Sequence, residues 1–343
     1  MKKLWLHSVK FYIKLGLFFY YRRIHVYKVE NIPKDKPILF LSNHQNALLD
    51  ALLIATTSGR FSYFLTRASV FTKPIVIKLL RSLQMLPVYR IRDGWSNLTN
   101  NNPIFESCTE LLKNNEAVVI FPEGSHNLKR TVRPLSKGFT RIVFDTLEKY
   151  PKTELQLVSV GLNFESATAY GDSCSIFYGK AISAKKYITE DRNQSVVDLK
   201  EDIHDEISKL TTHIESEGYE DTLNTLKALN ADFLNPKAVN ACIKNDFNEC
   251  GFMKTKRLSV IKTFLKFVLI INLIVPFAIW KLLIQPKIIE EEFIGTFRFA
   301  VGISLVPMWI LAVIMLLASM VSFQLAMMYL FFVLGLSLLT VKT

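Results

Sequence analysis

The sequence predicts an α/β domain joined to a carboxy-terminal membrane region, and three observations lead to this fold class. Short apolar runs alternate with amphipathic stretches between about residues 37 and 180, which is typical of a mixed sheet flanked by helices. The 43 residues from Phe299 to Val341 carry no charge, and one membrane crossing takes roughly 20 apolar residues. The amino end is both basic and aromatic.

Residues 1–36 contain nine Lys or Arg side chains against two acidic ones, which gives +7 of the net charge of +12. Aromatic residues such as Trp5 and Phe11 lie between the cations. This mixture predicts an amphipathic segment on an anionic membrane surface. Nucleic-acid binding is the alternative for such a segment. Because the same chain contains long apolar stretches, we expect membrane lipids as partners and no nucleic acid.

Residues 37–215 are expected to form the α/β domain. Strands are predicted at 37–42, 61–66, 117–121, 156–162 and 175–178, and helices at 47–57, 73–82, 104–114 and 137–148. Apolar residues at steps of three and four predict a further amphipathic helix over 196–214.

A helical connector is predicted for 216–257, followed by a membrane region, 258–343. Its three expected transmembrane helices lie at about 263–284, 299–320 and 322–341. Buried helices of a soluble protein are the alternative, which the length and uniformity of the apolar runs disfavour. The basic cluster at 254–257 predicts a multi-pass membrane protein with its globular part on the cytoplasmic face. The acidic loop Glu290–Glu292 is then expected on the opposite side.

The four cysteines, Cys108, Cys174, Cys242 and Cys250, show no metal-type spacing. We expect four free thiols in a reducing compartment. The sequence also lacks the common phosphate-loop, serine-hydrolase and zinc-protease motifs. No metal or other cofactor is therefore predicted.

Polar residues interrupt the apolar stretch "ILFLSNHQNALLDALLIA". His44 follows the end of a predicted strand, and Asp50 lies in the next predicted helix. The two form either a buried structural hydrogen bond or a base with its orienting carboxylate. A neutral imidazole accepts a hydroxyl proton when a carboxylate holds its other ring nitrogen.

The segment "FPEGSHN" follows another apolar strand, and ligands of open α/β sheets bind at the carboxyl ends of strands. Lys129, Arg130, Arg133 and Lys137 come soon after it and suit an anion such as phosphate. For Lys129 and Arg130, contact with anionic lipid is the alternative. In "PVYRIR", Arg90 and Arg92 are two residues apart in an extended stretch, so both side chains lie on the same face. This arrangement predicts a second anion contact.

Four segments, "SNHQNALLD", "PVYR", "FPEGS" and "LVSVGL", resemble in order the four sequence blocks of the glycerol-phosphate and lysophosphatidate acyltransferase superfamily. The resemblance covers about residues 30–215. It implies that His44 is the general base and Asp50 its partner. It also implies an acceptor and phosphate site formed by Arg90, Glu123, Gly124, Ser125, Arg133 and Lys137, supported by Asn43, Phe121 and Pro122. Residues 158–162 would line the acyl side.

The implied activity is O-acyl transfer from a thioester, acyl-CoA or acyl-carrier protein, to 1-acyl-glycerol-3-phosphate, giving phosphatidate. The "NHQNALLDA" and "FPEGSH" forms also resemble a branch that acts on glycerol-3-phosphate or dihydroxyacetone phosphate, so this acceptor remains an alternative.

One departure from the family pattern concerns the spacing between His44 and Asp50. Five residues separate the two, where the family has four. One extra helical residue turns a side chain by about 100°. We expect Asn46 to cap the helix so that the extra residue lies before it. If this fails, the alternative is a non-catalytic lipid-binding protein.

Overall fold

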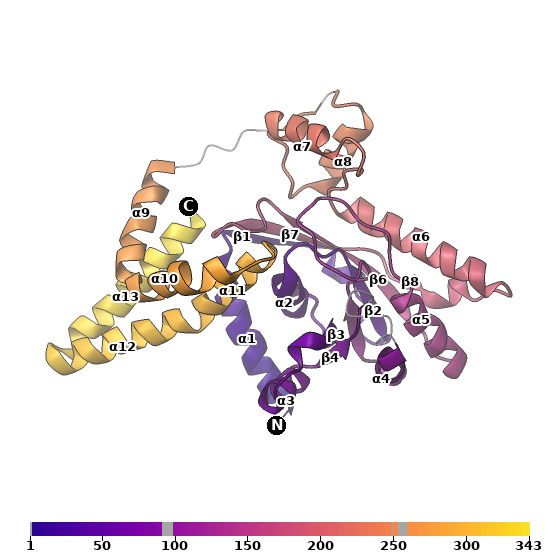
Figure 1. Ribbon diagram of the computed structural model, residues 1–343, viewed down its shortest axis with the longest axis horizontal. Coiled ribbons are helices and arrows are strands. Elements are labelled where there is room, and N and C mark those ends of the chain that lie inside the picture. The colour runs from indigo at the N-terminus through magenta and orange to yellow at the C-terminus, as the bar shows by residue number, and fades with distance from the viewer. Residues whose placement is uncertain (1, 91–98, 249, 253–258) are drawn as a thin grey trace.

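The computed structural model describes residues 2–90, 99–248, 250–252 and 259–343. Its centre is one eight-stranded sheet in the order β1-β7-β6-β2-β5-β3-β4, with β8 paired to β6 (Figure 1). The strands are β1 (Arg23–Tyr27), β2 (Ile38–Ser42), β3 (Ser62–Arg67), β4 (Met85–Val88), β5 (Ala117–Ile120), β6 (Gln156–Phe164), β7 (Ser173–Tyr178) and β8 (Ile182–Ser183).

The sheet is mixed, as the sequence predicts. Strands β6, β2, β5, β3 and β4 run parallel, so their carboxyl ends share one edge. Strand β7 pairs antiparallel with β6, and β1 pairs parallel with β7. All five residues of β2 are buried, because helices cover both faces of the sheet.

The helices α4 (Asn102–Lys113), α5 (Gly138–Lys149) and α6 (Arg192–Leu210) cover one face, where Leu39 and Leu41 of β2 contribute to the core. The other face meets α2 (Ala47–Thr57), α1 (Lys2–Tyr20) and α11 (Phe293–Ile303), with Ile38 and Phe40 in its core. Alternate β2 side chains thus enter opposite cores. Helix α3 (Pro74–Ser82) connects β3 to β4.

The predicted helix 47–57 has the observed bounds, and the other predicted strands and helices of the domain agree within a few residues. The predicted amphipathic segment 1–36 contains α1, whose face with Leu4 and Phe11 is exposed, and also a strand that the sequence analysis missed. Residues 23–27 form edge strand β1 because their alternating apolar side chains pair with β7. Arg92 and the basic cluster 254–257 lie outside the described residues.

Two short helices, α7 (Tyr219–Ala228) and α8 (Pro236–Lys244), form a small cluster in the connector around Leu226 and Val239. A disulfide joins Cys242 to Cys250, with 5.3 Å between their Cα atoms. The expectation of four free thiols is therefore wrong for this pair, which the chain turn after α8 brings together. Cys108 and Cys174 are free and buried, as expected.

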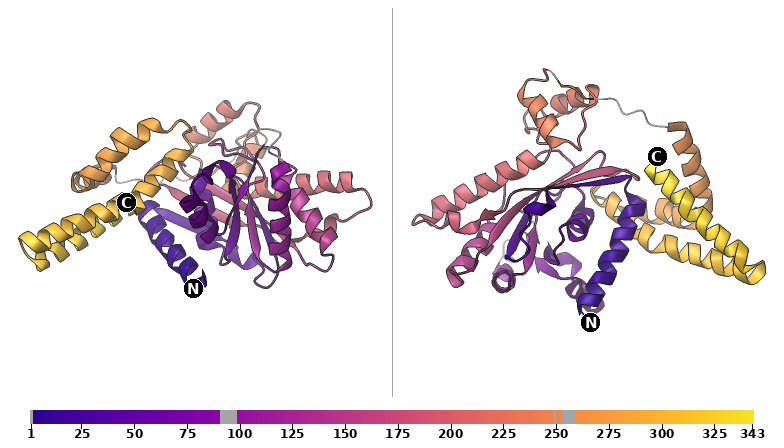
Figure 2. Two further views of the ribbon diagram at one scale, coloured as in Figure 1. Left: turned by 60° about the horizontal axis from the view of Figure 1, so that its bottom comes forward. Right: turned by 180° about the vertical axis from the view of Figure 1, so that it is seen from behind.

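The carboxy-terminal region contains α9 (Ser259–Asn272), α10 (Ile274–Ala278), the π-helix η6 (Ile279–Ile284), the turn η7 (Gln285–Lys287), α11, α12 (Leu305–Met320) and α13 (Phe323–Lys342). Two helical segments are long and apolar enough to cross a membrane, 293–320 and 323–342. Within them, α12 and α13 form a hairpin that projects away from the sheet (Figure 2). The segment predicted as the first crossing is instead a helix pair bent by 99°, so the described residues contain two helices that could cross a membrane, or three if this pair counts as one.

Asp172, next to the start of β7, provides a test of this fold by pH. Its Oδ1 accepts the Ser166 backbone N–H at 2.9 Å, and within the described residues its Oδ2 has no hydrogen-bond partner. Burial raises the pKa of Asp172 to about 6, against 3.8 for the free group. Because the folded state then binds the extra proton between these values, this carboxyl lowers stability as pH rises from about 4 to 6.

We expect Asp172→Asn, which keeps the oxygen acceptor, to remove this penalty of up to about 3 kcal/mol. The Tm of the variant minus that of wild type should rise between pH 4 and 6 and stay level above, measured in detergent. Asp35→Asn, at an exposed position, is the control and should give a flat difference. A flat difference for Asp172→Asn as well would contradict the prediction.

Candidate active site

The imidazole of His44 contacts the carboxylate of Asp50 at the carboxyl end of β2. His44 Nδ1 lies 2.8 Å from Asp50 Oδ2, and the Asp50 side chain is fully buried. The same Oδ2 accepts the Asn46 backbone N–H at 2.7 Å. Since N–H groups at a helix start need an acceptor, Asp50 serves the start of α2 and the histidine together. The other ring nitrogen of His44, Nε2, takes no part in this contact.

The extra residue between His44 and Asp50 is absorbed at the first residue of α2. Ala47 has a positive φ of 43°, a left-handed conformation that turns the chain into the helix. Asn46 stands at the cap position, but its side chain makes no capping bond and donates to the Ala167 carbonyl at 2.8 Å. The expected side-chain cap is therefore wrong, although the helix begins where the sequence predicts.

Asn43 and Phe121 hold the histidine in place. The Asn43 side-chain amide donates to the Leu162 carbonyl at 2.9 Å and accepts the Leu162 N–H at 2.8 Å, which fastens the loop to β6. The Phe121 ring stacks on the His44 ring, with 4.0 Å between centroids. Both residues thus restrict the imidazole, and the predicted acyl-side segment 158–162 lies in the neighbouring strand β6.

The segment after β5 forms a tight turn around Gly124, whose φ is 74° and whose N–H donates to the Phe121 carbonyl at 3.1 Å. The buried Glu123 Oε2 accepts from Arg133 Nε at 2.7 Å. Burial raises the pKa of Glu123, and the charges of Arg133 and His44 partly oppose this shift. The Pro122 carbonyl accepts the Ser136 N–H at 2.8 Å, which closes the loop.

Arg133 is mainly a clamp for this turn. Its Nη1 donates to Ser125 Oγ at 2.7 Å, and its Nη2 donates to the Ser125 carbonyl. With the bond to Glu123, these use three of the five guanidinium N–H groups. Two N–H groups remain for an anion, so Arg133 can contact a phosphate only from a fixed position.

The other predicted cations lie farther apart. Arg90 follows β4 at the same sheet edge, but β4 is three strands from β2, roughly 14 Å at ordinary strand spacing. Lys137 is exposed just before α5. Lys129 and Arg130 instead pack on the connector, over the rings of Tyr219 and Phe233. Burial lowers the pKa of Arg130 to about 10, and neither residue of this pair joins the His44 site.

The structure adds residues that the sequence analysis did not place at the site. The His126 ring lies edge-on to His44, with 5.6 Å between centroids, and its Nε2 is 2.8 Å from Glu290 Oε2. The prediction that the Glu290–Glu292 loop lies across the membrane from the catalytic domain is therefore wrong. His126 was visible as the residue after "FPEGS", whereas no local signal links it to a residue 164 positions away.

Helix α11 continues this contact. Phe293 packs edge-on against His126 at 4.7 Å, and Thr296 Oγ1 accepts the Leu48 N–H of α2 at 3.2 Å. A Cβ on Gly295 would lie 2.7 Å from Asn46 Oδ1, so a larger residue would require the Asn46 side chain to shift. The start of α11 thus forms a wall of the site.

His126, Glu290 and Glu292 could also hold a metal ion, because their ligand atoms lie within 4.8 Å of one another. One imidazole and two carboxylates suit a divalent cation. The sequence analysis expected no metal, and that expectation stays a prediction. Burial lowers the pKa of His126, which favours the neutral form that a metal requires.

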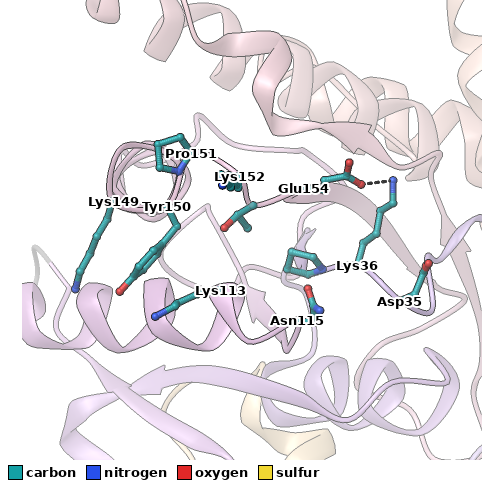
Figure 3. A pocket seen from close by; sticks show the side chains of 11 residues that line it. Asp35, Lys36, Lys113, Asn115, Lys149, Tyr150, Pro151, Lys152 and Glu154 are labelled. Carbon is teal, nitrogen blue, oxygen red and sulfur yellow. Dashed lines mark ion pairs between the residues drawn. The ribbon is translucent and has the colours of Figure 1, made fainter.

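A cavity of about 660 Å³ lies at the opposite edge of the sheet (Figure 3). It is lined where the chain enters β2, β5 and β6, by residues such as Pro37, Asn115 and Glu154. Four lysines line it, and two of them, Lys36 and Lys149, are paired with carboxylates. The cavity is thus remote from His44.

Comparison with known proteins shows similarity over the amino-terminal half of this chain. Residues 23–161 match the family model described as Acyltransferase. The chain is 27% identical over 130 residues to 1-acyl-sn-glycerol-3-phosphate acyltransferase LPAT1, chloroplastic, of Arabidopsis thaliana, and 25% identical over 138 residues to the BAT2 protein of the same description from Brassica napus. These alignments cover 38% and 40% of this chain, and only 34% and 38% of the relatives.

Among solved structures, the 1-acyl-sn-glycerophosphate (LPA) acyltransferase PlsC of Thermotoga maritima is similar, with a TM-score of 0.43 and 19% identity. The match covers 60% of this chain and 80% of that one. Residues 23–161 are therefore similar to acyltransferase domains, and the two plant relatives act on 1-acyl-sn-glycerol-3-phosphate by their descriptions. The resemblance in the four sequence blocks is confirmed at the level of the superfamily.

The shared Asp50 oxygen predicts different effects for two substitutions. Asp50→Asn keeps an oxygen that can accept from Asn46, but loses the charge that stabilises an imidazolium at His44. We expect kcat for acyl transfer to fall at least about 100-fold while Tm changes little. Asp50→Ala should lose activity and also lower Tm, because the start of α2 then lacks its acceptor. An Asn variant with wild-type kcat would show that the pair is only structural.

Proposed function

We propose that this protein is a membrane-bound O-acyltransferase that transfers a fatty acyl chain from a thioester to the hydroxyl of 1-acyl-glycerol-3-phosphate, giving phosphatidate. The observation that carries the proposal is the 2.8 Å contact between His44 Nδ1 and Asp50 Oδ2 at the carboxyl edge of a parallel sheet. The superfamily and the two plant relatives support the reaction class and the acceptor.

The proposed chemistry uses His44 as a general base. Asp50 holds Nδ1–H, so Nε2 accepts the proton of the acceptor hydroxyl as its oxygen attacks the thioester carbonyl. The carbonyl–oxygen bond forms, the carbon–sulfur bond breaks, and the proton on His44 passes to the departing thiolate. Asp50 stabilises the imidazolium between these steps. The acceptor hydroxyl is the nucleophile, so no enzyme nucleophile is required.

The acceptor phosphate is proposed to lie at the carboxyl edge of the sheet, between Arg133 on one side and Arg90 and Lys137 on the other. Arg133 offers its two remaining N–H groups from a position fixed by Glu123 and Ser125. Arg90 reaches in from the end of β4, and Lys137 adds charge from the start of α5. In this acceptor only a few bonds separate the hydroxyl from the phosphate, so the phosphate lies near His44 and the long cationic side chains have to extend to it there.

Glycerol-3-phosphate or dihydroxyacetone phosphate is the second candidate acceptor. It is favoured by the longer spacing between His44 and Asp50 and by the residue His126 after "FPEGS". The donor is an acyl thioester, either acyl-CoA or acyl-carrier protein. A lipid-binding protein without turnover is the candidate of another class, and only the unusual spacing supports it.

We propose that the catalytic domain lies on the cytoplasmic face of a multi-pass membrane protein. The basic cluster 254–257 supports this orientation. The Cys242–Cys250 disulfide opposes it, since disulfides persist mainly in oxidising compartments. The labelling experiment in the next subsection measures this orientation directly.

The function is tested by turnover of purified protein in detergent with labelled acyl-CoA or acyl-carrier protein. We expect one acceptor among lysophosphatidate, glycerol-3-phosphate and a lyso-aminolipid to be acylated, and His44→Ala to abolish the product. Arg90→Ala should raise the KM for a phosphate-bearing acceptor about tenfold or more with a smaller change in kcat, because a charge-assisted contact is lost.

Lys129→Ala is the matched control, since this cation packs on the connector and should leave the KM for the acceptor unchanged. Turnover that persists in His44→Ala would exclude the proposed base. Binding of lysolipid without turnover of any acceptor would favour the lipid-binding alternative.

A further inference from the structure

The bent segment from α9 to η7 begins and ends beside the catalytic domain. Near its start, Lys262 Nζ lies 3.9 Å from the position of a Cβ on Gly171, in the loop before β7. Just after its end, Glu290 contacts His126. Because both ends meet the same domain, the segment between them crosses the bilayer an even number of times or not at all.

Neither arm of the segment is long enough for a crossing. The arms, 260–272 and 274–287, have 13 and 14 residues and meet at 99°. Each spans roughly 20 Å as a helix, whereas the hydrocarbon core is about 30 Å thick. The residues around the bend, 267–280, carry no charge, while Lys266 and Lys281 lie just outside this stretch. The charge pattern therefore fits a segment that is deepest at its bend.

A backbone carbonyl that proline leaves without a helical donor at the bend still has a hydrogen-bond partner, which a backbone group inside a membrane requires. Pro276 has no N–H, so the Asn272 carbonyl lacks its usual helical donor four residues later. The indole Nε1 of Trp309, from α12, donates to this carbonyl at 2.9 Å. A side chain of α12 thus replaces the hydrogen bond that proline removes. The bend is therefore stabilised by a specific tertiary contact.

The outer surface of the segment suits lipid. Exposed apolar side chains occur along both arms: Val260, Phe264, Phe267, Ile271, Ile274, Leu282 and Leu283. Inside the protein, α9 packs against α13. The carboxyl end of α13 returns to the catalytic domain, where Lys342 Nζ donates to the Tyr21 carbonyl at 2.9 Å. Both ends of the hairpin of 293–320 and 323–342 therefore also lie on one side.

We propose that residues 259–287 form a re-entrant loop, which enters and leaves the bilayer on the side of the catalytic domain. The chain then crosses the membrane twice, through 293–320 and 323–342. The return of the loop delivers Glu290 and Phe293 to His126, so the membrane region builds one wall of the His44 site as well as anchoring it.

The test is labelling of single cysteines with a membrane-impermeant maleimide, in intact cells and after permeabilisation. Three variants of the full chain are compared: Lys152→Cys in the catalytic domain, Ile289→Cys after the loop, and Val321→Cys at the turn of the hairpin. All three positions are exposed. Wild type is the control and should stay unlabelled, because its cysteines are buried or joined in the disulfide.

We expect Ile289→Cys and Lys152→Cys to react from the same side, and Val321→Cys from the other. Three crossings would place residue 289 opposite residue 152, and residue 321 on the same side as residue 152. That pattern, or reaction of all three from one side, would overturn the proposal. The labelling requires no turnover, so it succeeds or fails independently of the proposed reaction.

A second measurement tests the built bend. Trp309→Phe removes only the indole donor and should lower Tm by about 2 °C. In a Pro276→Ala background the restored N–H can bond to Asn272, so the same Trp309→Phe change should cost less than half as much. An equal loss in both backgrounds would overturn the role of the indole and the built bend on which the re-entrant loop depends.

Discussion

The site depends on one carboxylate oxygen that two donors share. Asp50 Oδ2 accepts from the His44 ring and from the Asn46 backbone at the start of α2. Asp50 is fully buried, and these two hydrogen bonds fix the loop between β2 and α2. The left-handed Ala47 is what lets a five-residue spacing reach the same oxygen. Catalytic geometry and helix start are thus a single constraint.

The walls around this pair come from distant parts of the chain. Phe121 covers one face of the imidazole, Asn43 fastens the loop to β6, and the Arg133 clamp keeps the turn after β5 rigid. The first turns of α11 then press on α2 through Gly295 and Thr296. The membrane region and the catalytic domain therefore share one core, in which Phe299 is 2% exposed.

Much of the fold followed from local patterns. The buried run Ile38–Ser42 and the helix Ala47–Thr57 were predicted within one residue, because apolar periodicity and chain length identify such elements without their neighbours. Strand β1 was missed because its five residues lie in a basic, aromatic segment with no clear strand pattern. They form a strand only because they pair with β7. The Cys242–Cys250 bond was missed because its spacing matches no motif.

The sequence by itself determined the fold class and the residues that lie along one edge of the sheet, because parallel strands end at the same edge whatever the details of packing. His44, Glu123 and Arg90 belong to this set. Only the tertiary structure decided which cations face the site, that Arg130 is a buried connector contact, and that Glu290 reaches His126. These depend on pairs far apart in the chain, whose approach is set by packing free energy that no local segment encodes.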